Sequence, residues 1–296
     1  MPPEFNPSFQ VPNWSWWIVL YFFFGGITGG TYFAAAWLDL FGDARDRAAI
    51  WLGHLLTFPL LVLCTAFLIV DLGQPLRFWH MLLQSERLPL PMFKAYSPMS
   101  FGSVILAVFG LVAFVSFVDA LLAGRDGRLH APGNPIGKIV AAIGAVGGLA
   151  LAGYTGVLVN VTNLPVWSTS PWLGMLFLFS GVSTGIAFLL LIARRYPSTT
   201  IEKLEEADNY MMILESIALV LFLLGLGVIG SRFILGNPPV LALFLVVIVV
   251  GLAVPFALRF IPRRPAAFAG LASVCVLVGG FVLRWAVLAG PQGVGL

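Results

Sequence analysis

Residues 16–40 read WWIVLYFFFGGITGGTYFAAAWLDL, with no charged side chain before Asp39. A helix needs roughly 20 apolar residues to cross a lipid bilayer, so this stretch predicts a transmembrane helix. Residues 1–13 contain no Lys or Arg, whereas a cleavable signal peptide begins with a basic segment. We therefore expect this first apolar run to be retained as a helix.

Seven similar runs follow the first. The chain of 296 residues is 59% hydrophobic and 10% charged, with a mean hydropathy of +0.98, whereas soluble proteins are about 25% charged. The sequence thus predicts an all-α integral membrane protein with about eight transmembrane helices in two four-helix bundles, forming a single polytopic membrane domain over residues 1–296. We expect the helices at about residues 16–40, 50–70, 100–122, 136–159, 171–193, 211–229, 240–259 and 266–288.

The basic residues indicate how the chain is oriented. Most of the 16 Lys and Arg residues fall in the loops after the first, third, fifth and seventh expected helices. Positive loops remain on the cytoplasmic side of a membrane, so both termini are expected to be extracytoplasmic. The net charge of +3 is therefore explained by membrane topology rather than by binding to nucleic acid.

Histidines and cysteines limit the cofactors that this protein could hold. A haem b in a membrane needs axial histidines on facing helices, but the histidines here are His54 and His130 at the expected cytoplasmic end and His80 in an outer loop. Cys64 and Cys275 lack the spacing of a zinc or iron–sulfur site. We expect no haem and no metal on this chain, so a redox role would need a carrier that diffuses in lipid or one held by a partner.

Polar residues at the outer ends of the helices are the first candidates for a site. Asp71 ends the second helix, and Tyr21 and Tyr154 lie at a similar depth in the first and fourth. A phenol can donate a hydrogen bond to a carbonyl while its ring contacts an apolar tail. Asp71 is interpreted as a proton acceptor, as a cap of the following turn or as an ion-pair partner of Arg77. The connection over residues 71–99 is the longest, and long loops are often functional.

Ionisable residues within membrane helices are functional candidates by default. Glu215 is expected about one turn into the sixth helix from the cytoplasmic side, and Asp119 near the same side of the third. Together they could form a proton route, but a carboxylate at this depth can also extend to the interface. Arg284 is expected near the outer end of the last helix.

Glycines recur at a spacing of four residues in two expected helices. The first helix contains Gly25 and Gly29 together with Gly26 and Gly30, and the fourth contains Gly144 and Gly148. Small residues at this spacing let helix backbones approach closely in membranes. We interpret them as packing positions.

Several short segments, taken in order, resemble one family. They are Trp16 to Tyr21 leading to Gly29 and Gly30; Val70 to Pro75 with Arg77 and Phe78; Ser97 to Gly102; Tyr154 to Leu158; Pro165 to Trp167; and Ser180 to Gly185. In this order they resemble the NrfD family, the membrane subunits typified by polysulfide reductase and formate-dependent nitrite reductase. The resemblance covers about the first two thirds of the chain, and the last third matches only as apolar helices.

The resemblance implies a quinone-reactive subunit of a respiratory oxidoreductase complex, free of haem and inactive alone, in the inner membrane of a bacterium. Its substrate would be menaquinone or ubiquinone. On the extracytoplasmic face it would meet a ferredoxin-like iron–sulfur subunit, which in turn contacts a molybdopterin-type catalytic subunit.

The same resemblance implies roles for individual residues. Tyr21, Tyr154 and Trp17 would contact the quinone, Trp167 would wall the pocket or meet the partner, and Asp71 would exchange protons with help from His80. The alternative for His80 is a loop residue in an amphipathic turn, and the alternative for Trp167 is the interfacial aromatic belt. Relatives can carry His or Asn on the first helix, so the head-group contacts differ here.

Two other functions stay open. A secondary transporter would place charged groups at the bilayer midplane and interrupt helices at corresponding points of its two halves, whereas the polar groups here are expected at helix ends. A purely structural membrane anchor would keep its complex active after replacement of Tyr154 and Asp71.

Overall fold

Eight apolar helical stretches form the described part of the protein. The computed structural model describes residues 14–83, 93–94, 96–124, 127–131, 133–193, 198–259, 261 and 266–292. It is 87% helical, and within these ranges eight stretches are long and apolar enough to cross a membrane. This confirms the predicted all-α fold with about eight transmembrane helices. Six basic residues of the orientation argument lie outside the described ranges: Arg87, Arg125, Arg194, Arg195, Arg263 and Arg264.

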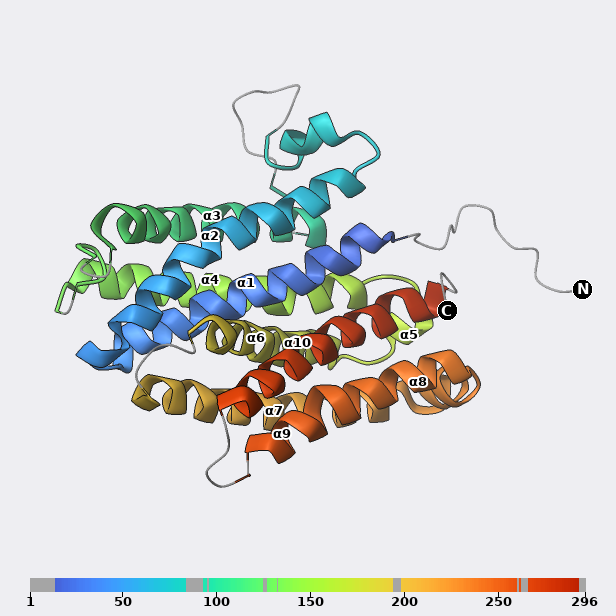
Figure 1. The fold of residues 1–296 in the computed structure, drawn as a ribbon. Helices are drawn as coiled ribbons and strands as arrows, with labels where there is room; N and C mark the ends of the chain where they lie inside the picture. Colours follow the sequence, from blue (N-terminus) through green and yellow to red (C-terminus); the bar gives the residue numbers. More distant parts are fainter. Residues whose placement is uncertain are drawn as a thin grey trace, which may run out of the picture.

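The first four long helices form one bundle. They are α1 (Trp16–Phe41), α2 (Arg47–Asp71), α3 (Pro98–Ala123) and α4 (Pro135–Asn160). Helix α1 packs against α2 and α4, and α3 closes the bundle by packing against the same two helices (Figure 1). Two short 3₁₀ helices accompany them, η1 (Ala44–Asp46) before α2 and η2 (Pro75–Met81) after it.

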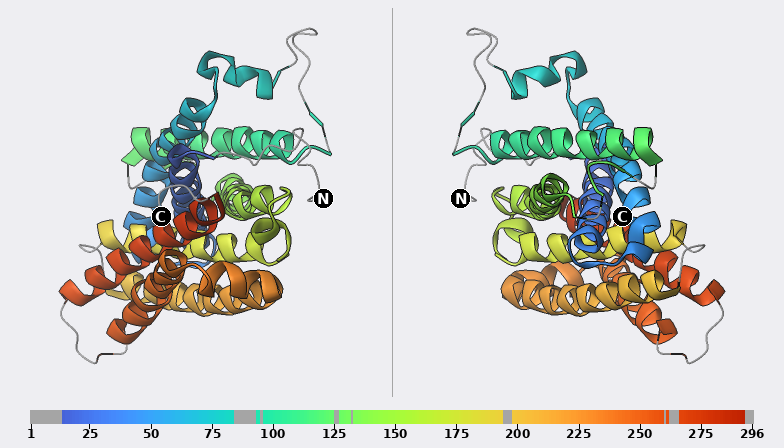
Figure 2. Two further views of the ribbon diagram at one scale, coloured as in Figure 1. Left: turned by 90° about the vertical axis from the view of Figure 1, so that its right-hand side faces the viewer. Right: turned by 90° about the vertical axis from the view of Figure 1, so that its left-hand side faces the viewer.

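The second half of the chain packs on the first through α6. Its elements are α5 (Pro165–Ser168), α6 (Leu173–Ile192), α7 (Ser198–Gly230), η5 (Ser231–Leu235), α8 (Pro238–Val246), η6 (Val247–Ala253), α9 (Val254–Arg259), α10 (Ala266–Ala289) and η7 (Gly290–Gln292). Helix α6 contacts α1 and α4 on one side and α7 and α10 on the other. Figures 1 and 2 show α3 and η2 on one flank of the molecule and α8 and α9 on the opposite flank.

One predicted boundary is wrong by more than a few residues. The sixth transmembrane helix begins at Ser198 rather than at Met211. Residues 198–210 are rich in charged side chains, so a search for apolar runs stops short of them. The backbone nevertheless continues as helix, because helical hydrogen bonds form within the chain whether or not lipid surrounds it.

Glycines bring the central helices into backbone contact. A Cβ atom on Gly29 would collide with the backbone of Gly148, and one on Gly30 would collide with Gly181 and Gly185. The interpretation of these glycines as packing positions is therefore confirmed for α1 against α4, and it extends to α1 against α6.

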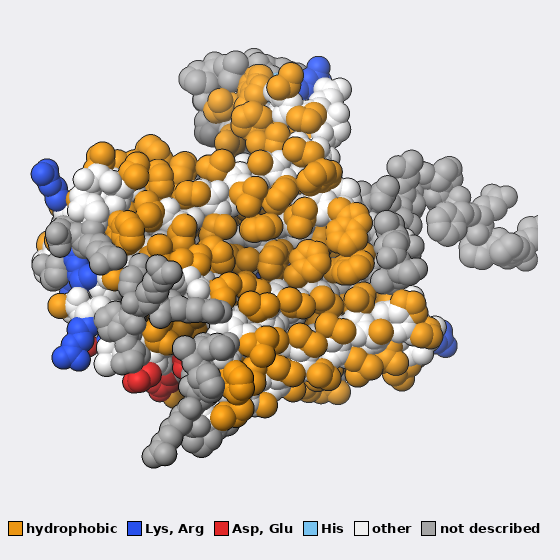
Figure 3. All heavy atoms as spheres, viewed as in Figure 1, with side chains coloured by type: hydrophobic (Ala, Val, Ile, Leu, Met, Phe, Trp, Pro, Cys, Tyr) orange, Lys and Arg blue, Asp and Glu red, His pale blue; other side chains and the backbone are white. Residues whose placement is uncertain are grey.

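The first and last described segments lie at the same end of the bundle. The backbone N–H of Trp14 donates to Oε1 of Gln292 at 2.6 Å, and Figure 1 shows the start of α1 and the end of α10 on one side. We call this the outer end and the opposite one the inner end, after the prediction from the basic residues. In Figure 3 the Lys and Arg side chains gather mainly at the inner end, and an apolar surface separates the two ends. The chain is a multi-pass membrane protein, while its orientation stays a prediction.

Candidate functional site

A cavity of about 650 Å³ opens in the outer half of the first bundle, between α1, α2, α3 and α4. Most of its wall is apolar, and the polar groups on it are Tyr21, Thr65, Asp71, Ser103 and Tyr154. The structure therefore brings together three predicted site residues from three different helices. The remaining lining side chains include Trp14, Ile18, Phe22, Phe58, Leu61, Leu68, Met99, Leu106 and Leu158.

Asp71 lies at the outer edge of this cavity, where α2 ends. Its carboxylate accepts a hydrogen bond from the Ser15 hydroxyl, and Ser15 is also the N-cap of α1. This contact ties the start of α1 to the end of α2. The expected alternative of an ion pair with Arg77 does not form among the described residues.

Tyr154 is held by two features of α3. Its hydroxyl donates to the backbone carbonyl of Pro98 at 2.7 Å, and its ring occupies the space that a side chain on Gly102 would need. The Tyr154 side chain is thereby fixed against the first turns of α3, with one edge on the cavity.

Tyr21 carries a hydroxyl that is less engaged by the protein than the hydroxyl of Tyr154. Its side chain is buried, with 2% of the residue exposed, yet it lines the cavity. Its hydroxyl has no hydrogen-bond partner among the residues that the structure describes, and it lies near Tyr154 and Cys64. The Tyr21 hydroxyl is therefore available to a ligand, whereas that of Tyr154 already donates to the protein.

The short helix η2 and the residue after it contribute to the wall of the cavity. Phe78, Met81 and Leu82 from this segment reach the lining, but His80 does not. Its imidazole instead stacks on Trp79 with ring centroids 3.8 Å apart. A role for His80 in proton exchange stays a prediction.

Two predicted tryptophans also lie outside the lining. Trp17 is 43% exposed and stacks on Phe67. Trp167 is fully buried, and its indole N–H donates to the carbonyl of Val287 at 2.6 Å. The Trp167 ring stacks on Trp14, which does line the cavity, so Trp167 supports the wall from behind.

The cavity opens sideways toward lipid. Val62, Ala66 and Ala107 all line it, and all are exposed on the outside of the bundle. An apolar molecule dissolved in the membrane can therefore reach the cavity between α2 and α3 without crossing an aqueous phase.

Glu215 and Arg284 are both buried inside the protein. Because α7 begins at Ser198, Glu215 falls in the middle of that helix and is 5% exposed. Arg284 is fully buried, and it donates to the carbonyls of Phe22 and Gly280 and to the Ser180 hydroxyl. Arg284 nevertheless lies near the outer end of α10, which ends at Ala289, as expected.

Asp119 acts on the loop after α3. Its carboxylate accepts hydrogen bonds from the backbone N–H groups of Arg128 and Leu129, at 3.0 and 2.9 Å. These bonds fold the loop back onto the inner end of α3. A part in a proton route stays a prediction.

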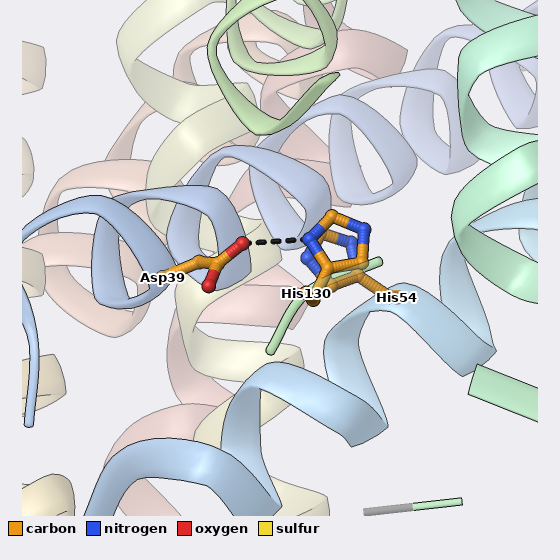
Figure 4. A group of neighbouring side chains, drawn as sticks. All are labelled: Asp39, His54 and His130. Carbon is orange, nitrogen blue, oxygen red and sulfur yellow. Dashed lines mark hydrogen bonds and ion pairs between the residues drawn. The ribbon is translucent and has the colours of Figure 1, made fainter. Parts of the chain in front are cut away.

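One polar cluster was not predicted from the sequence. Asp39, His54 and His130 meet at the inner end of the first bundle, from α1, α2 and the loop before α4 (Figure 4). Sequence spacing gives no hint of this, because the three residues are far apart in the sequence. The one available signal was that two of three histidines were expected at the same membrane face.

Comparison with known proteins matches nearly the whole sequence to one family. The family model described as "Polysulphide reductase, NrfD" matches residues 5–294. A protein of Haemophilus influenzae named "Protein NrfD homolog" is 26% identical, and the match spans 99% of both proteins.

Two further relatives carry names of reductase components. A chain of the polysulfide reductase of Wolinella succinogenes is 26% identical, and the match spans 94% of both proteins. A subunit of the selenate reductase of Mesobacillus selenatarsenatis is 30% identical, but over only 25% of the present sequence and 17% of that protein.

Proposed function

The chain belongs to the NrfD family, and from this membership we propose that it is the quinone-reactive membrane subunit of a multisubunit reductase in a bacterial inner membrane. The observation that carries the proposal is the cavity of about 650 Å³, with an apolar wall, a few polar groups and a lateral opening. Ligand pockets for small molecules typically measure about 300–1,000 Å³ and share this composition.

The cavity fits both parts of a prenylated quinone. Phe58, Leu61 and Leu106 offer an apolar channel to a tail, and burial of apolar surface stabilises such a ligand by roughly 25 cal/mol per Å². Tyr21 and Asp71 offer polar contacts to the head group. Because menaquinone and ubiquinone share carbonyl groups and an isoprenoid tail, the proposal covers both.

A bound quinone takes up two electrons and two protons when it is reduced to a quinol. The Tyr21 hydroxyl is available to donate a hydrogen bond to a quinone carbonyl. Asp71, held by Ser15 at the edge of the cavity, can pass protons between the head group and water at the outer end. Tyr154 shapes the pocket through its contact with Gly102.

Partners supply the electrons in this proposal. Two relatives are named as components of a polysulfide reductase and of a selenate reductase, and these names support assembly with other reductase subunits. We propose an iron–sulfur subunit docked at the outer end and a molybdopterin-type subunit beyond it. The terminal substrate would then be set by the partner and not by this protein.

The buried charged residues Glu215 and Arg284 are a feature that a secondary transporter would also have. Arg284, however, is bonded to protein groups on three sides. Interrupted helices also occur only in the second half among the described residues, at Gly227 in α7 and at η6. A transporter built from repeated halves would interrupt both, so the quinone-reactive subunit is the better-supported function.

The test replaces one hydroxyl in the intact complex. Tyr21→Phe keeps the ring but removes the donor, so we expect a rise of roughly tenfold in KM for quinol, equivalent to a lost hydrogen bond of about 1.4 kcal/mol. Tyr210→Phe is the matched control, because Tyr210 is exposed on α7 and its hydroxyl bonds to Glu206 alone among the described residues. Quinone extracted from each purified complex measures binding directly. Unchanged KM and unchanged quinone content in the Tyr21 variant would refute the assignment.

A further inference from the structure

A chain of hydrogen bonds runs through the inner half of the first bundle. Nδ1 of His130 lies 2.6 Å from Oδ2 of Asp39, and Nε2 of His130 lies 3.1 Å from the Ser116 hydroxyl. The Ser116 hydroxyl in turn lies 2.9 Å from the Tyr32 hydroxyl. His130 and Ser116 are nearly or fully buried, and Tyr32 is fully buried.

His54 lies beside this chain without a partner. Its ring stacks on His130 with centroids 4.0 Å apart, and the edge of the Tyr32 ring lies against it. Both His54 ring nitrogens are buried, and neither has a hydrogen-bond partner among the described residues. A buried imidazole with two unused nitrogens is costly, which indicates that this group binds something in the working protein.

The arrangement of the two rings favours a proton over a metal ion. One nitrogen each from His54 and His130 and an oxygen of Asp39 lie within 4.8 Å of one another, and such ligands suit Zn²⁺. Both nitrogens of His130 are already engaged, however, and the planes of the two imidazoles are only 19° apart. Two imidazoles on one ion must point their in-plane lone pairs at the same spot, which parallel stacked rings do not do.

The inner end of the chain reaches the surface through a small cavity. It is lined by His54 and His130 together with Arg47, Trp51 and Asp119. Its volume of about 10 Å³ is at the lower limit for holding one water molecule. The charged groups facing the two histidines are thus Asp39 from α1, Arg47 from α2 and Asp119 from α3, and the Arg47 side chain donates to the His130 carbonyl.

The other end of the chain lies below the large outer cavity. Tyr32 packs in one apolar cluster with Leu61, Phe58 and Leu106, and these three side chains also line the cavity. On α2, His54 is one helical turn from Phe58, or about 6 Å. A single apolar layer therefore separates the hydrogen-bonded chain from the deep end of the cavity.

From these contacts we propose that Asp39, His130, Ser116 and Tyr32 form a proton relay between the inner surface and the outer cavity, with His54 stacked beside it. At each step one N–H or O–H bond breaks as the next forms, and no electron moves. Imidazole suits this task because one nitrogen can accept a proton while the other releases one. The last step, past Phe58 and Leu61, would need a water molecule that enters the deep end of the cavity.

The relay rests on the proposed function and gives it a direction across the membrane. Reduction of a quinone consumes two protons for two electrons that the iron–sulfur partner supplies. If the relay delivers protons, they come from the inner side although the cavity lies near the outer end. Quinol oxidation would run the same steps in reverse.

The test measures proton uptake in the whole complex, reconstituted into vesicles with the inner end facing a medium that contains a pH dye. Ser116→Ala removes the link between His130 and Tyr32. We expect proton uptake from the inner side to slow by roughly 100-fold, the lower part of the range for positioned proton transfer, with KM for quinone unchanged. Tyr32→Phe should do the same while keeping the ring packed against Gly144, and it serves if Ser116→Ala fails to assemble. Ser216→Ala is the control, because that hydroxyl bonds only within α7.

Three outcomes would overturn the relay. These are uptake in both variants equal to that of Ser216→Ala, a wild-type complex that takes no protons from the inner side, or a stoichiometric transition metal that is lost in His54→Ala. A wild-type complex without quinone-dependent turnover would refute the proposed function itself. Normal turnover without uptake from the inner side would refute the relay alone.

Discussion

The ring of Tyr154 on α4 occupies the position where a side chain on Gly102 of α3 would stand. The glycine therefore does more than allow two helices to approach, since it lets a phenol enter the wall of the cavity. A hydrogen bond from Tyr154 to the Pro98 carbonyl at 2.7 Å then fixes the ring. The shape of the cavity thus depends on a residue that offers no chemistry of its own.

Gly102→Ala should displace the Tyr154 ring and narrow the cavity. Insertion of a methyl group into a filled site costs about 1–3 kcal/mol, and we expect KM for quinone to rise while the complex still assembles. Gly73→Ala is the control, because a Cβ there meets no atom within 4 Å. Thermal unfolding and quinone titration of both variants measure the effect. Equal values in the two variants would contradict the packing argument.

Asp71→Asn should leave quinone binding almost unchanged while it impairs proton exchange with the bound quinone. The amide oxygen can still accept the hydrogen bond from Ser15, so the local structure and KM should change little. The amide does not titrate, so kcat of quinone turnover should fall by roughly 100-fold. Asp43→Asn provides the comparison, because its side chain is 74% exposed at the opposite end. Wild-type kcat in the Asp71 variant would exclude its part in proton exchange and support a structural role.

Gly148→Ala should destabilise the crossing of α1 and α4. The new methyl group would meet the backbone of Gly29, and backbone atoms cannot turn aside as the end of a side chain does. We expect a loss of about 1–3 kcal/mol in the free energy of unfolding, measured with denaturant in mixed micelles. Gly153→Ala on the same helix should be nearly neutral, because its nearest neighbour, Leu178, lies 3.6 Å away. Similar losses at both positions would argue against a specific crossing point.

Arg284→Met should weaken the contact between α10 and α1. It removes the hydrogen bonds to Phe22 and Ser180 and leaves Glu215 without its nearby positive charge. Loss of one member of a buried charge network costs about 3 kcal/mol. Adding Glu215→Gln should recover part of this loss, because the uncompensated carboxylate is then gone. Strictly additive losses in the double variant would show that the two charges do not interact in the folded protein.

The transmembrane pattern could be predicted because the bilayer imposes it on the sequence directly. Each run must be apolar for roughly 20 residues, so the ends of α3 and α4 fall within two residues of their predicted positions. The start of α7 could not be found in this way, because residues 198–210 form helix without an apolar run. Glu215 therefore falls in the middle of α7 rather than near the start of that helix.

From the sequence, the residues of the candidate site could be predicted only by their depth in the membrane. Tyr21, Asp71 and Tyr154 were expected at one depth, and the structure puts all three on one cavity. Depth says nothing about rotation around a helix axis, which depends on how neighbouring helices interlock. Trp17, His80 and Trp167 were expected at the same outer side, and yet all three lie outside the lining.

The sequence by itself determined how many helices form, that they lie in a membrane, and which glycines permit close packing. It did so because these follow from the composition of each segment taken alone. Only the tertiary structure decided that His54 and His130 stack at 4.0 Å and that Tyr154 fills the space above Gly102. Such contacts join segments far apart in the sequence, and their energy depends on the positions of both partners, which no local pattern of residues records.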